Sequence, residues 1–222
     1  GSESGGFYSS INADSENQEG KFYVWERNEI KKIIDPEDFN IIEKYYGLDE
    51  EANFENRWHL TVSNDTENIE KDSKFESEKL ENIVKKCNKV LHKERKLRTP
   101  PSLDKKQLTS WNALVIKGLV VSGRVLDRKD YIQSARESLE FIEKNQFDKN
   151  ILMACYINKM SKFPAYLDDH AFLLDAILEF LQSEWDTKLF HFAIKLADTL
   201  IDNFLDEEKG GFFFTRNNHE KL

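Results

Sequence analysis

Two consecutive stretches of the chain repeat one pattern of apolar and polar positions. Residues 110–126 and 129–144 form two predicted helices joined by a short polar turn, and residues 169–182 and 187–204 repeat this arrangement. An offset of 58 residues aligns the two stretches without a gap, and it pairs Ala113 with Ala171, Ala135 with Ala193 and Asp148 with Asp206. This register predicts two helical hairpins that are copies of one structural unit.

The two helices of each predicted copy differ in the width of their apolar face. The first helix is apolar around most of its circumference, whereas the second carries one apolar stripe and one charged face. Because a helix that is apolar all round is buried and an amphipathic helix lies outside it, each copy supplies one inner and one outer helix. Two concentric layers of helices predict an all-α fold, a fragment of an α/α toroid with short β-hairpins in its loops.

The first hundred residues follow a different pattern. Two aromatic runs, 5–10 and 21–25, flank a polar acidic stretch and predict a β-hairpin with a long tip. The stretch 53–73 is polar and aperiodic, which predicts a loop. Further helices are predicted at 26–34, 36–46 and 77–98.

Composition and charge narrow the classes of protein that fit this chain. Its 222 residues, 39% hydrophobic and 33% charged, suit one large folded domain over residues 3–222, after a Gly1-Ser2 start that resembles a tag remnant. The net charge of −9 repels phosphate backbones and argues against nucleic acid as a partner. No run approaches the roughly 20 apolar residues that span a bilayer, so the sequence predicts a soluble, cytoplasmic protein without a membrane partner.

The cysteines and histidines predict no metal site and no cofactor. Cys87 and Cys155 lie in unrelated segments without Cys-x-x-Cys spacing, which indicates neither a disulfide framework nor a redox centre. The histidines lack metal-ligand spacing with the cysteines; they are His59, His92, His170, His191 and His219. His170 directly follows two aspartates and is a candidate acid or base, with a role in helix packing as the alternative.

Five motifs occur in an order that is typical of one protein family. They are Gly5-Gly6-Phe7-Tyr8-Ser9-Ser10, Glu19-Gly20-Lys21-Phe22-Tyr23-Val24-Trp25, Leu108-Thr109-Ser110-Trp111-Asn112, Tyr166-Leu167-Asp168-Asp169 and Gly210-Gly211-Phe212. With these motifs the chain resembles the thioredoxin-domain proteins grouped with bacterial YyaL and mammalian spermatogenesis-associated protein twenty. The resemblance implies the middle part of an (α/α)6 toroid of the six-hairpin glycosidase type, related to N-acylglucosamine 2-epimerase folds, with the family's thioredoxin-like domain absent.

Residues at the start of the inner helices are the first site candidates, because toroids of this kind place the preceding loops around a central cavity. Trp111-Asn112 and Asp168-Asp169 occupy equivalent places in the two copies. Trp111 would offer a flat apolar face to a sugar ring, with Asn112 and Tyr166 as further substrate-binding residues. Asp168 or Asp169 would accept hydrogen bonds or transfer a proton, and helix capping is the alternative for both carboxylates.

A second group of candidates lies near the amino terminus and before the first repeat. Asp14, Glu16 and Glu19 crowd the predicted hairpin tip, where desolvated carboxylates would raise one another's pKa, so that an acid and a base could coexist there. A solvated acidic turn is the alternative. Lys105 would neutralise a substrate carboxylate or pair with Asp104, and an ordinary surface contact is the alternative for this lysine.

Two functional hypotheses follow. The first is a carbohydrate-processing or carbohydrate-binding domain of glycosidase or epimerase type, in which Asp14 or Glu16 would act with Asp168 or Asp169 as acid and base. The second is a non-catalytic scaffold or client-binding module that serves a thioredoxin-like domain. The scaffold hypothesis predicts an apolar surface patch where that domain docks.

Overall fold

The computed structural model describes residues 2, 5–72 and 76–216, so that Gly1 of the expected tag remnant and His219 lie outside the described residues. The chain is mostly helical with short strands. It forms two compact units: unit 1 comprises Gly1–Ser10 and Leu103–Leu222, and unit 2 comprises Ile11–Ser102. The expectation of one domain over 3–222 stays a prediction. Within the described residues, every helix is too short or too polar to cross a membrane.

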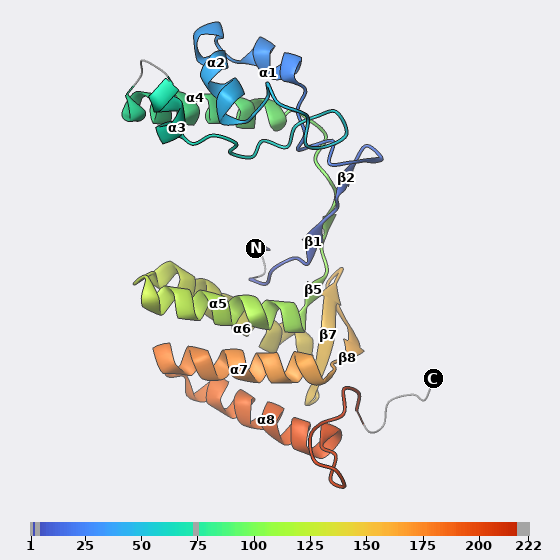
Figure 1. Ribbon diagram of the computed structural model, residues 1–222. Coiled ribbons are helices and arrows are strands. Elements are labelled where there is room, and N and C mark those ends of the chain that lie inside the picture. The colour runs from blue at the N-terminus through green and yellow to red at the C-terminus, as the bar shows by residue number, and fades with distance from the viewer. Residues whose placement is uncertain (1, 3–4, 73–75, 217–222) are drawn as a thin grey trace. The chain divides into compact units, whose positions relative to one another are not determined.

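Unit 1 contains the two predicted helical hairpins (Figure 1). The first hairpin consists of α5 (Thr109–Val125) and α6 (Lys129–Gln146), and the second of α7 (Leu167–Ser183) and α8 (Thr187–Phe204). Each helix of the second hairpin begins and ends 58 residues after its counterpart in the first. The repeat that the sequence pattern predicted is therefore confirmed at the level of helix bounds.

The first helices of the two hairpins are neighbours. Helix α5 packs against α6 and α7, and α7 packs against α8, so each first helix carries its own second helix. Lys117 Nζ lies 2.7 Å from Asp175 Oδ2, and Arg124 pairs with Glu179, which links α5 to α7 along their length. One apolar core joins the four helices; its fully buried members include Ile116, Val120, Leu139, Ile142, Leu173, Ile177, Phe180 and Leu196.

One face of α5 departs from the expectation that the first helices are buried on all sides. Trp111 is 53% exposed and Leu114 is 51% exposed, and Val115, Val121 and Val125 are exposed on the same helix. The reason is that α6 and α7 cover only part of the circumference of α5. An apolar stripe on α5 therefore lies at the surface of unit 1 as the structure describes it.

Unit 1 contains a small antiparallel sheet; short β-hairpins in the loops were expected, but the sequence pattern did not assign these strands. Its strands are β5 (Gln107–Leu108), β6 (Phe147–Asp148), β7 (Ile151–Ile157) and β8 (Met160–Pro164). Strand β7 pairs with the other three. Asn158 and Lys159 form the tight turn between β7 and β8, with φ angles of 52° and 62° that match a two-residue hairpin loop. The sheet fixes the start of α5, because the Thr109 hydroxyl donates to the Met153 carbonyl oxygen at 2.6 Å.

Unit 2 contains four helices among its described residues: α1 (Arg27–Ile33), α2 (Pro36–Tyr45), α3 (Thr66–Asp72) and α4 (Ser77–Arg95). Helices α1, α2 and α4 lie where the sequence predicted them. Helix α3 lies in the stretch predicted as loop. It begins at an Asp65 carboxylate that accepts a hydrogen bond from the Asn68 amide at 2.8 Å, and it buries one apolar side chain, Ile69. Ile69 is the one apolar residue in the sequence of α3, so the sequence shows no detectable helical period there.

The predicted hairpin between the two aromatic runs is wrong. The observed hairpin is shorter and lies within the polar stretch, where β2 (Asp14–Ser15) pairs with β3 (Gln18–Glu19) across a turn at Glu16 and Asn17. The second aromatic run instead enters the core of unit 2, with Val24 and Trp25 buried. The chain passes from unit 1 to unit 2 within β1 (Ser10–Ile11) and returns before β4 (Leu103–Asp104).

Candidate functional site

The first turns of α5 and α7 are joined by one buried carboxylate. Asp169 Oδ1 accepts a hydrogen bond from the Ser110 amide at 2.9 Å, and Oδ2 accepts one from the Tyr166 amide at 3.0 Å. Asp169 is 3% exposed. Helix starts leave amide groups without helical partners, and Asp169 satisfies one at each of the two helices. Asp169 therefore acts as a helix cap, which was the alternative role inferred from the sequence, and it caps α5 as well as its own helix α7.

The environment of Asp169 acts on its protonation in two directions. Burial raises the pKa of the Asp169 carboxyl group, and the hydrogen bonds from the Tyr166 and Ser110 amides offset part of that rise. The charge of neighbouring Asp168 raises the pKa of Asp169 further. Asp169 thus combines a raised proton affinity with a position between two helix starts.

Asp168 is placed differently from its neighbour. Its side chain is half-buried, and Oδ1 accepts a hydrogen bond from the Asp169 amide at 3.0 Å. The ring of Tyr166, the residue before α7, stacks on the ring of Phe214 with centroids 5.3 Å apart. Asp168 is therefore the aspartate of this pair that solvent reaches.

Trp111 and Asn112 point to different environments, although they are adjacent in α5. Trp111 is exposed, whereas Asn112 is buried and holds the backbone at Phe7. Asn112 Oδ1 accepts from the Phe7 amide at 2.7 Å, and Nδ2 donates to the carbonyl oxygens of Phe7 and Leu108 at 3.1 and 2.8 Å. Asn112 therefore positions the backbone around the start of α5.

Lys105 is exposed and does not make the ion pair that its sequence position suggested. Lys106 Nζ, not Lys105 Nζ, lies 3.0 Å from Asp104 Oδ2. The Lys106 amide also donates to Asp104 Oδ1 at 3.1 Å, and these contacts lower the pKa of the Asp104 carboxyl group. The turn between β4 and β5 brings residue 106 back to residue 104. Because Lys105 and Lys106 are adjacent, the sequence did not indicate which of them pairs with Asp104.

His170 occupies the place in α7 that Asn112 occupies in α5, 58 residues earlier. It is 1% exposed, and its Nδ1 lies 2.8 Å from the Tyr166 carbonyl oxygen. Because a carbonyl oxygen only accepts, Nδ1 carries the proton, and Nε2 has no hydrogen-bond partner among the described residues. The imidazole ring packs on Phe204, with centroids 5.1 Å apart. These contacts correspond to the helix-packing alternative for His170.

We expect His170 to make stability depend on pH. Burial lowers the pKa of His170, and the charge of Arg216 lowers it further, while the Tyr166 carbonyl and Asp168 act against that shift. The unfolded chain therefore takes up a proton at this position more readily than the folded chain. The free energy of unfolding should fall as the pH drops below about 6.5, by at most about 1.4 kcal/mol per pH unit. Urea titrations between pH 5 and 7.5 should show a flatter dependence in His170→Phe, and equal slopes in the two proteins would contradict this assignment.

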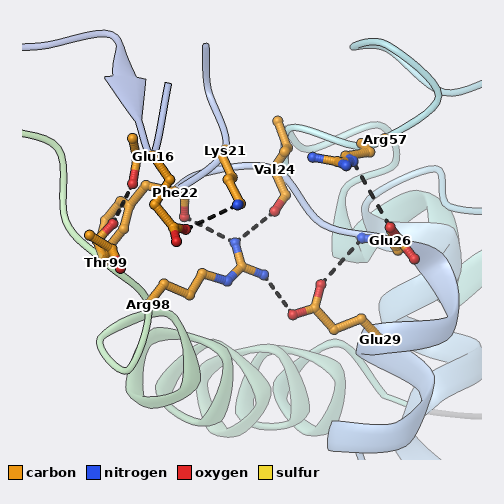
Figure 2. Close-up of a pocket in the computed structure, with 10 residues that line it drawn as sticks. Glu16, Lys21, Phe22, Val24, Glu26, Glu29, Arg57, Arg98 and Thr99 are labelled. Carbon is orange, nitrogen blue, oxygen red and sulfur yellow. Dashed lines mark hydrogen bonds and ion pairs between the residues drawn. The ribbon is translucent and has the colours of Figure 1, made fainter. Parts of the chain in front are cut away.

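The remaining acidic candidates, Asp14 and Glu16, belong to unit 2, whereas the residues described so far belong to unit 1. Asp14 is exposed, and its amide donates to Asn12 Oδ1 at 3.2 Å. Glu16 stands at the tip of the β2–β3 turn, where Oε2 lies 3.0 Å from Lys21 Nζ. Figure 2 shows Glu16 and Lys21 at the rim of a hollow in unit 2. Their pairing with Asp168 or Asp169 as acid and base stays a prediction.

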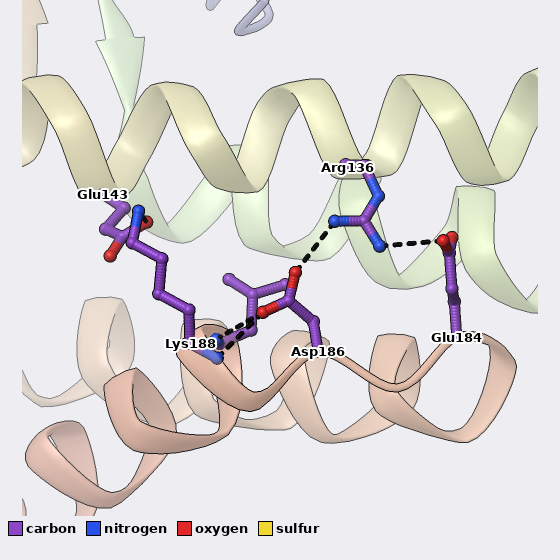
Figure 3. Close-up of polar contacts among 6 residues, drawn as sticks. Arg136, Glu143, Glu184, Asp186 and Lys188 are labelled. Carbon is purple, nitrogen blue, oxygen red and sulfur yellow. Dashed lines mark hydrogen bonds and ion pairs between the residues drawn. The ribbon is translucent and has the colours of Figure 1, made fainter.

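A polar cluster lies at the opposite end of α7, and the sequence pattern did not reveal it (Figure 3). Arg136 on α6 places Nη2 3.0 Å from Glu184 Oε1 and Nη1 3.0 Å from Asp186 Oδ2. Its guanidinium also lies over the Phe180 ring, 4.9 Å from the centroid. Asp186 caps α8 by accepting from the Lys188 and Leu189 amides. Arg136 therefore fastens the turn between α7 and α8 to the neighbouring hairpin.

We expect Arg136→Met to lower the free energy of unfolding by about 1–2 kcal/mol, because two ion pairs are lost at a side chain that is mostly buried. Urea unfolding at low and high salt measures the loss, which should shrink at high salt. Arg128→Met is the matched control, since Arg128 and its partner Asp130 are both well exposed. A loss in the control equal to that in Arg136→Met would contradict the role of Arg136.

Metal and thiol chemistry have no visible site in the described part of the chain. Among residues 2, 5–72 and 76–216, no group of three or more His, Cys, Asp or Glu side chains is placed to hold a metal ion. Cys87 and Cys155 are both buried free thiols. Burial raises the pKa of Cys87 to about 11 and also raises the pKa of Cys155, so both remain protonated at neutral pH.

Comparison with known proteins gives sequence relatives but no family model, since none matches this chain. Human spermatogenesis-associated protein 20 is 28% identical over 246 aligned positions, which cover 95% of this chain and 31% of that protein. The chain is a distant homologue of spermatogenesis-associated protein 20. The rat protein of the same name is 27% identical with the same coverage, and an uncharacterized protein of Caenorhabditis elegans is 26% identical over 79% of this chain. The chain spans about a third of the length of these relatives.

Solved structures resemble part of the chain. Cellobiose 2-epimerase from Bacillus thermoamylovorans superimposes with a TM-score of 0.47 at 17% identity, covering 53% of this chain and 34% of the epimerase. An α-amylase from Clostridium perfringens superimposes with a TM-score of 0.43 at 11% identity, covering 53% of this chain and 33% of the amylase. Both matches thus extend over about half of the present chain.

Proposed function

We propose that unit 1 is part of an α/α toroid that binds carbohydrate at the end where α5 and α7 begin. The observation that carries this proposal is the 2.9 Å hydrogen bond from the Ser110 amide to Asp169 Oδ1. Because this bond joins the two first turns, Trp111 and Asp168, the residues next to it, belong to the same end of the helix pair. An exposed indole and a solvent-accessible carboxylate suit a sugar, whose C–H faces stack on aromatic rings and whose hydroxyl groups donate to carboxylate oxygens.

The roles that we assign follow the accessibility of each side chain. Trp111 is the stacking platform, and Asp168 accepts hydrogen bonds from sugar hydroxyl groups. Asp169 and Asn112 hold the two helix starts in place and are positioning residues. Tyr166 and Lys105 are further sugar-binding residues at the edge of the proposed site; Tyr166 is half-buried and Lys105 is exposed.

Catalysis of the glycosidase or epimerase type is a further step of the same proposal. Asp168 would act as acid or base, and Asp14 or Glu16 stays the sequence-based expectation for the second carboxylate. In a glycosidase, a separation of about 5–5.5 Å between the two carboxyl groups would accompany retention at the anomeric carbon, and about 6.5–9.5 Å inversion. Product analysis by NMR of a turned-over glycoside distinguishes the two outcomes.

Calorimetric titration with a library of mono- and oligosaccharides tests the binding proposal. We expect at least one sugar to bind, with a loss of tenfold or more in Trp111→Ala and in Asp168→Asn. Trp185→Ala is the matched control, because Trp185 is 64% exposed and lies in the turn between α7 and α8, at the other end of α7. The proposal fails when the wild-type protein binds no sugar, or when Trp185→Ala loses as much affinity as Trp111→Ala.

The apolar stripe of α5 favours the second candidate function, a scaffold for a thioredoxin-like domain. Leu114, Val115 and Val121 are exposed apolar side chains on one helix, which is the surface that the scaffold hypothesis expects. Leu114→Ser separates the two functions. Under the carbohydrate proposal it leaves sugar affinity unchanged, whereas under the scaffold proposal it weakens capture of a purified thioredoxin-like domain.

A further inference from the structure

Unit 2 contains a hollow of about 370 Å³ with a balanced set of charges on its walls (Figure 2). Three carboxylates and three cations line it: Glu16, Glu26, Glu29, Lys21, Arg57 and Arg98. Its volume falls within the lower part of the range for small-molecule sites. All lining residues belong to unit 2, whereas the helix starts described above belong to unit 1.

Arg98 forms a fixed part of the wall. Its guanidinium carbon lies 3.9 Å from the centroid of the Trp25 ring. Nη1 donates to the carbonyl oxygens of Phe22 and Val24 at 3.0 and 2.7 Å, and Nη2 lies 2.8 Å from Glu29 Oε1. A guanidinium with this many partners is held in one orientation, so Arg98 and Glu29 shape the hollow and are not available to exchange partners.

The other two charge pairs are loosely held. Lys21 and Glu16 form an ion pair of 3.0 Å between side chains that are 40% and 49% exposed. Arg57 Nε lies 4.0 Å from Glu26 Oε1, which is longer than a hydrogen bond. Exposed ion pairs contribute little to stability, so a ligand can replace either partner at small cost. The hollow thus offers two cations and two carboxylates to an incoming molecule.

We propose that this hollow binds a small zwitterion, a molecule with one ammonium and one carboxylate group such as an amino acid or a short peptide. The carboxylate would bind Arg57 and Lys21, since guanidinium groups bind carboxylates through paired hydrogen bonds. The ammonium group would bind Glu16 and Glu26. A simple anion would be repelled by the two glutamates, and a simple cation would be repelled by the two basic groups. A ligand that carries both charges therefore fits the walls best.

Titration of the wild-type protein with probes of graded charge separation tests the proposal without any variant. The probes are glycine, β-alanine, 4-aminobutanoate, 6-aminohexanoate and glycylglycine, with acetate, methylammonium and glucose as single-feature comparisons. We expect at least one zwitterion to bind tenfold or more tightly than acetate and methylammonium. The proposal is overturned if no zwitterion exceeds both of these ions, or if glucose alone binds.

Two variants then locate the site with matched controls. Arg57→Gln and Glu16→Gln should each weaken the best zwitterion by tenfold or more. Arg128→Gln and Glu81→Gln make the same changes in exposed ion pairs away from the hollow and should leave binding unchanged. Equal weakening in variants and controls would place the binding elsewhere. Far-ultraviolet circular dichroism confirms that each variant is folded, and the sugar titration of unit 1 should be unaffected in Arg57→Gln, Arg128→Gln and Glu81→Gln.

Discussion

Replacement of Asp169 by alanine is expected to lower the free energy of unfolding by about 3–4 kcal/mol. The change removes Asp169 as acceptor for the buried Ser110 amide and for the partly buried Tyr166 amide, and hydrogen bonds to a charged group contribute about 1.5–3 kcal/mol each. The loss of a carboxylate whose burial is itself unfavourable offsets part of that cost. Equilibrium unfolding in urea, with wild type and variant compared at the same pH, measures the difference.

Asp168→Ala is the matched control for this prediction. Asp168 is half-buried and accepts one hydrogen bond, from the Asp169 amide, so its removal should cost about 1 kcal/mol or less. Equal losses of unfolding free energy in Asp169→Ala and Asp168→Ala would contradict the account, because the connection between the starts of α5 and α7 would then not depend on Asp169.

Asn112→Ala is expected to lower the free energy of unfolding by about 2–4 kcal/mol. The buried amide of Asn112 satisfies the Phe7 amide, the Phe7 carbonyl oxygen and the Leu108 carbonyl oxygen, and alanine leaves all three without this partner. Urea unfolding measures the loss. Hydrogen exchange adds a local reading, since the Phe7 amide should exchange faster in the variant by a factor larger than the change in global stability explains.

Asn145→Ala is the control for Asn112→Ala. Asn145 is half-buried on α6, and its amide donates to the carbonyl oxygen of Phe141, one turn earlier in the same helix. Its loss should change stability by less than about 1 kcal/mol. If Asn145→Ala costs as much as Asn112→Ala, the segment at Phe7 is not held by Asn112.

The helical repeat was predictable because its signal is local. The apolar period and the constant offset placed all four helices of unit 1 within a few residues of their observed bounds. The β7–β8 hairpin carried a weaker signal, two apolar or mixed runs around Asn158-Lys159, and a two-residue turn without glycine is hard to recognise. The short helix α3 was missed for the same reason, since its capping aspartate is its main local feature.

The roles of the site residues depended on contacts that sequence patterns do not carry. Asn112 binds Phe7, 105 positions away, and Asp169 binds Ser110, 59 positions away. One local signal was available: a buried polar residue just inside an apolar helix must find backbone partners. A second lay at Gly6, where any Cβ atom would clash with the Gln107 side chain and the Phe141 ring, so the glycine marks a close approach of two segments.

An amide-resolved NMR titration with the best sugar from the library tests the central claim most directly, because it locates the bound molecule on unit 1. The account expects the largest chemical-shift changes at the amides of Ser110, Trp111, Asp168 and Asp169, where the two helices begin. Changes centred on Arg136 and Asp186, at the far end of α7, or no change at any amide for every sugar tested, would contradict it.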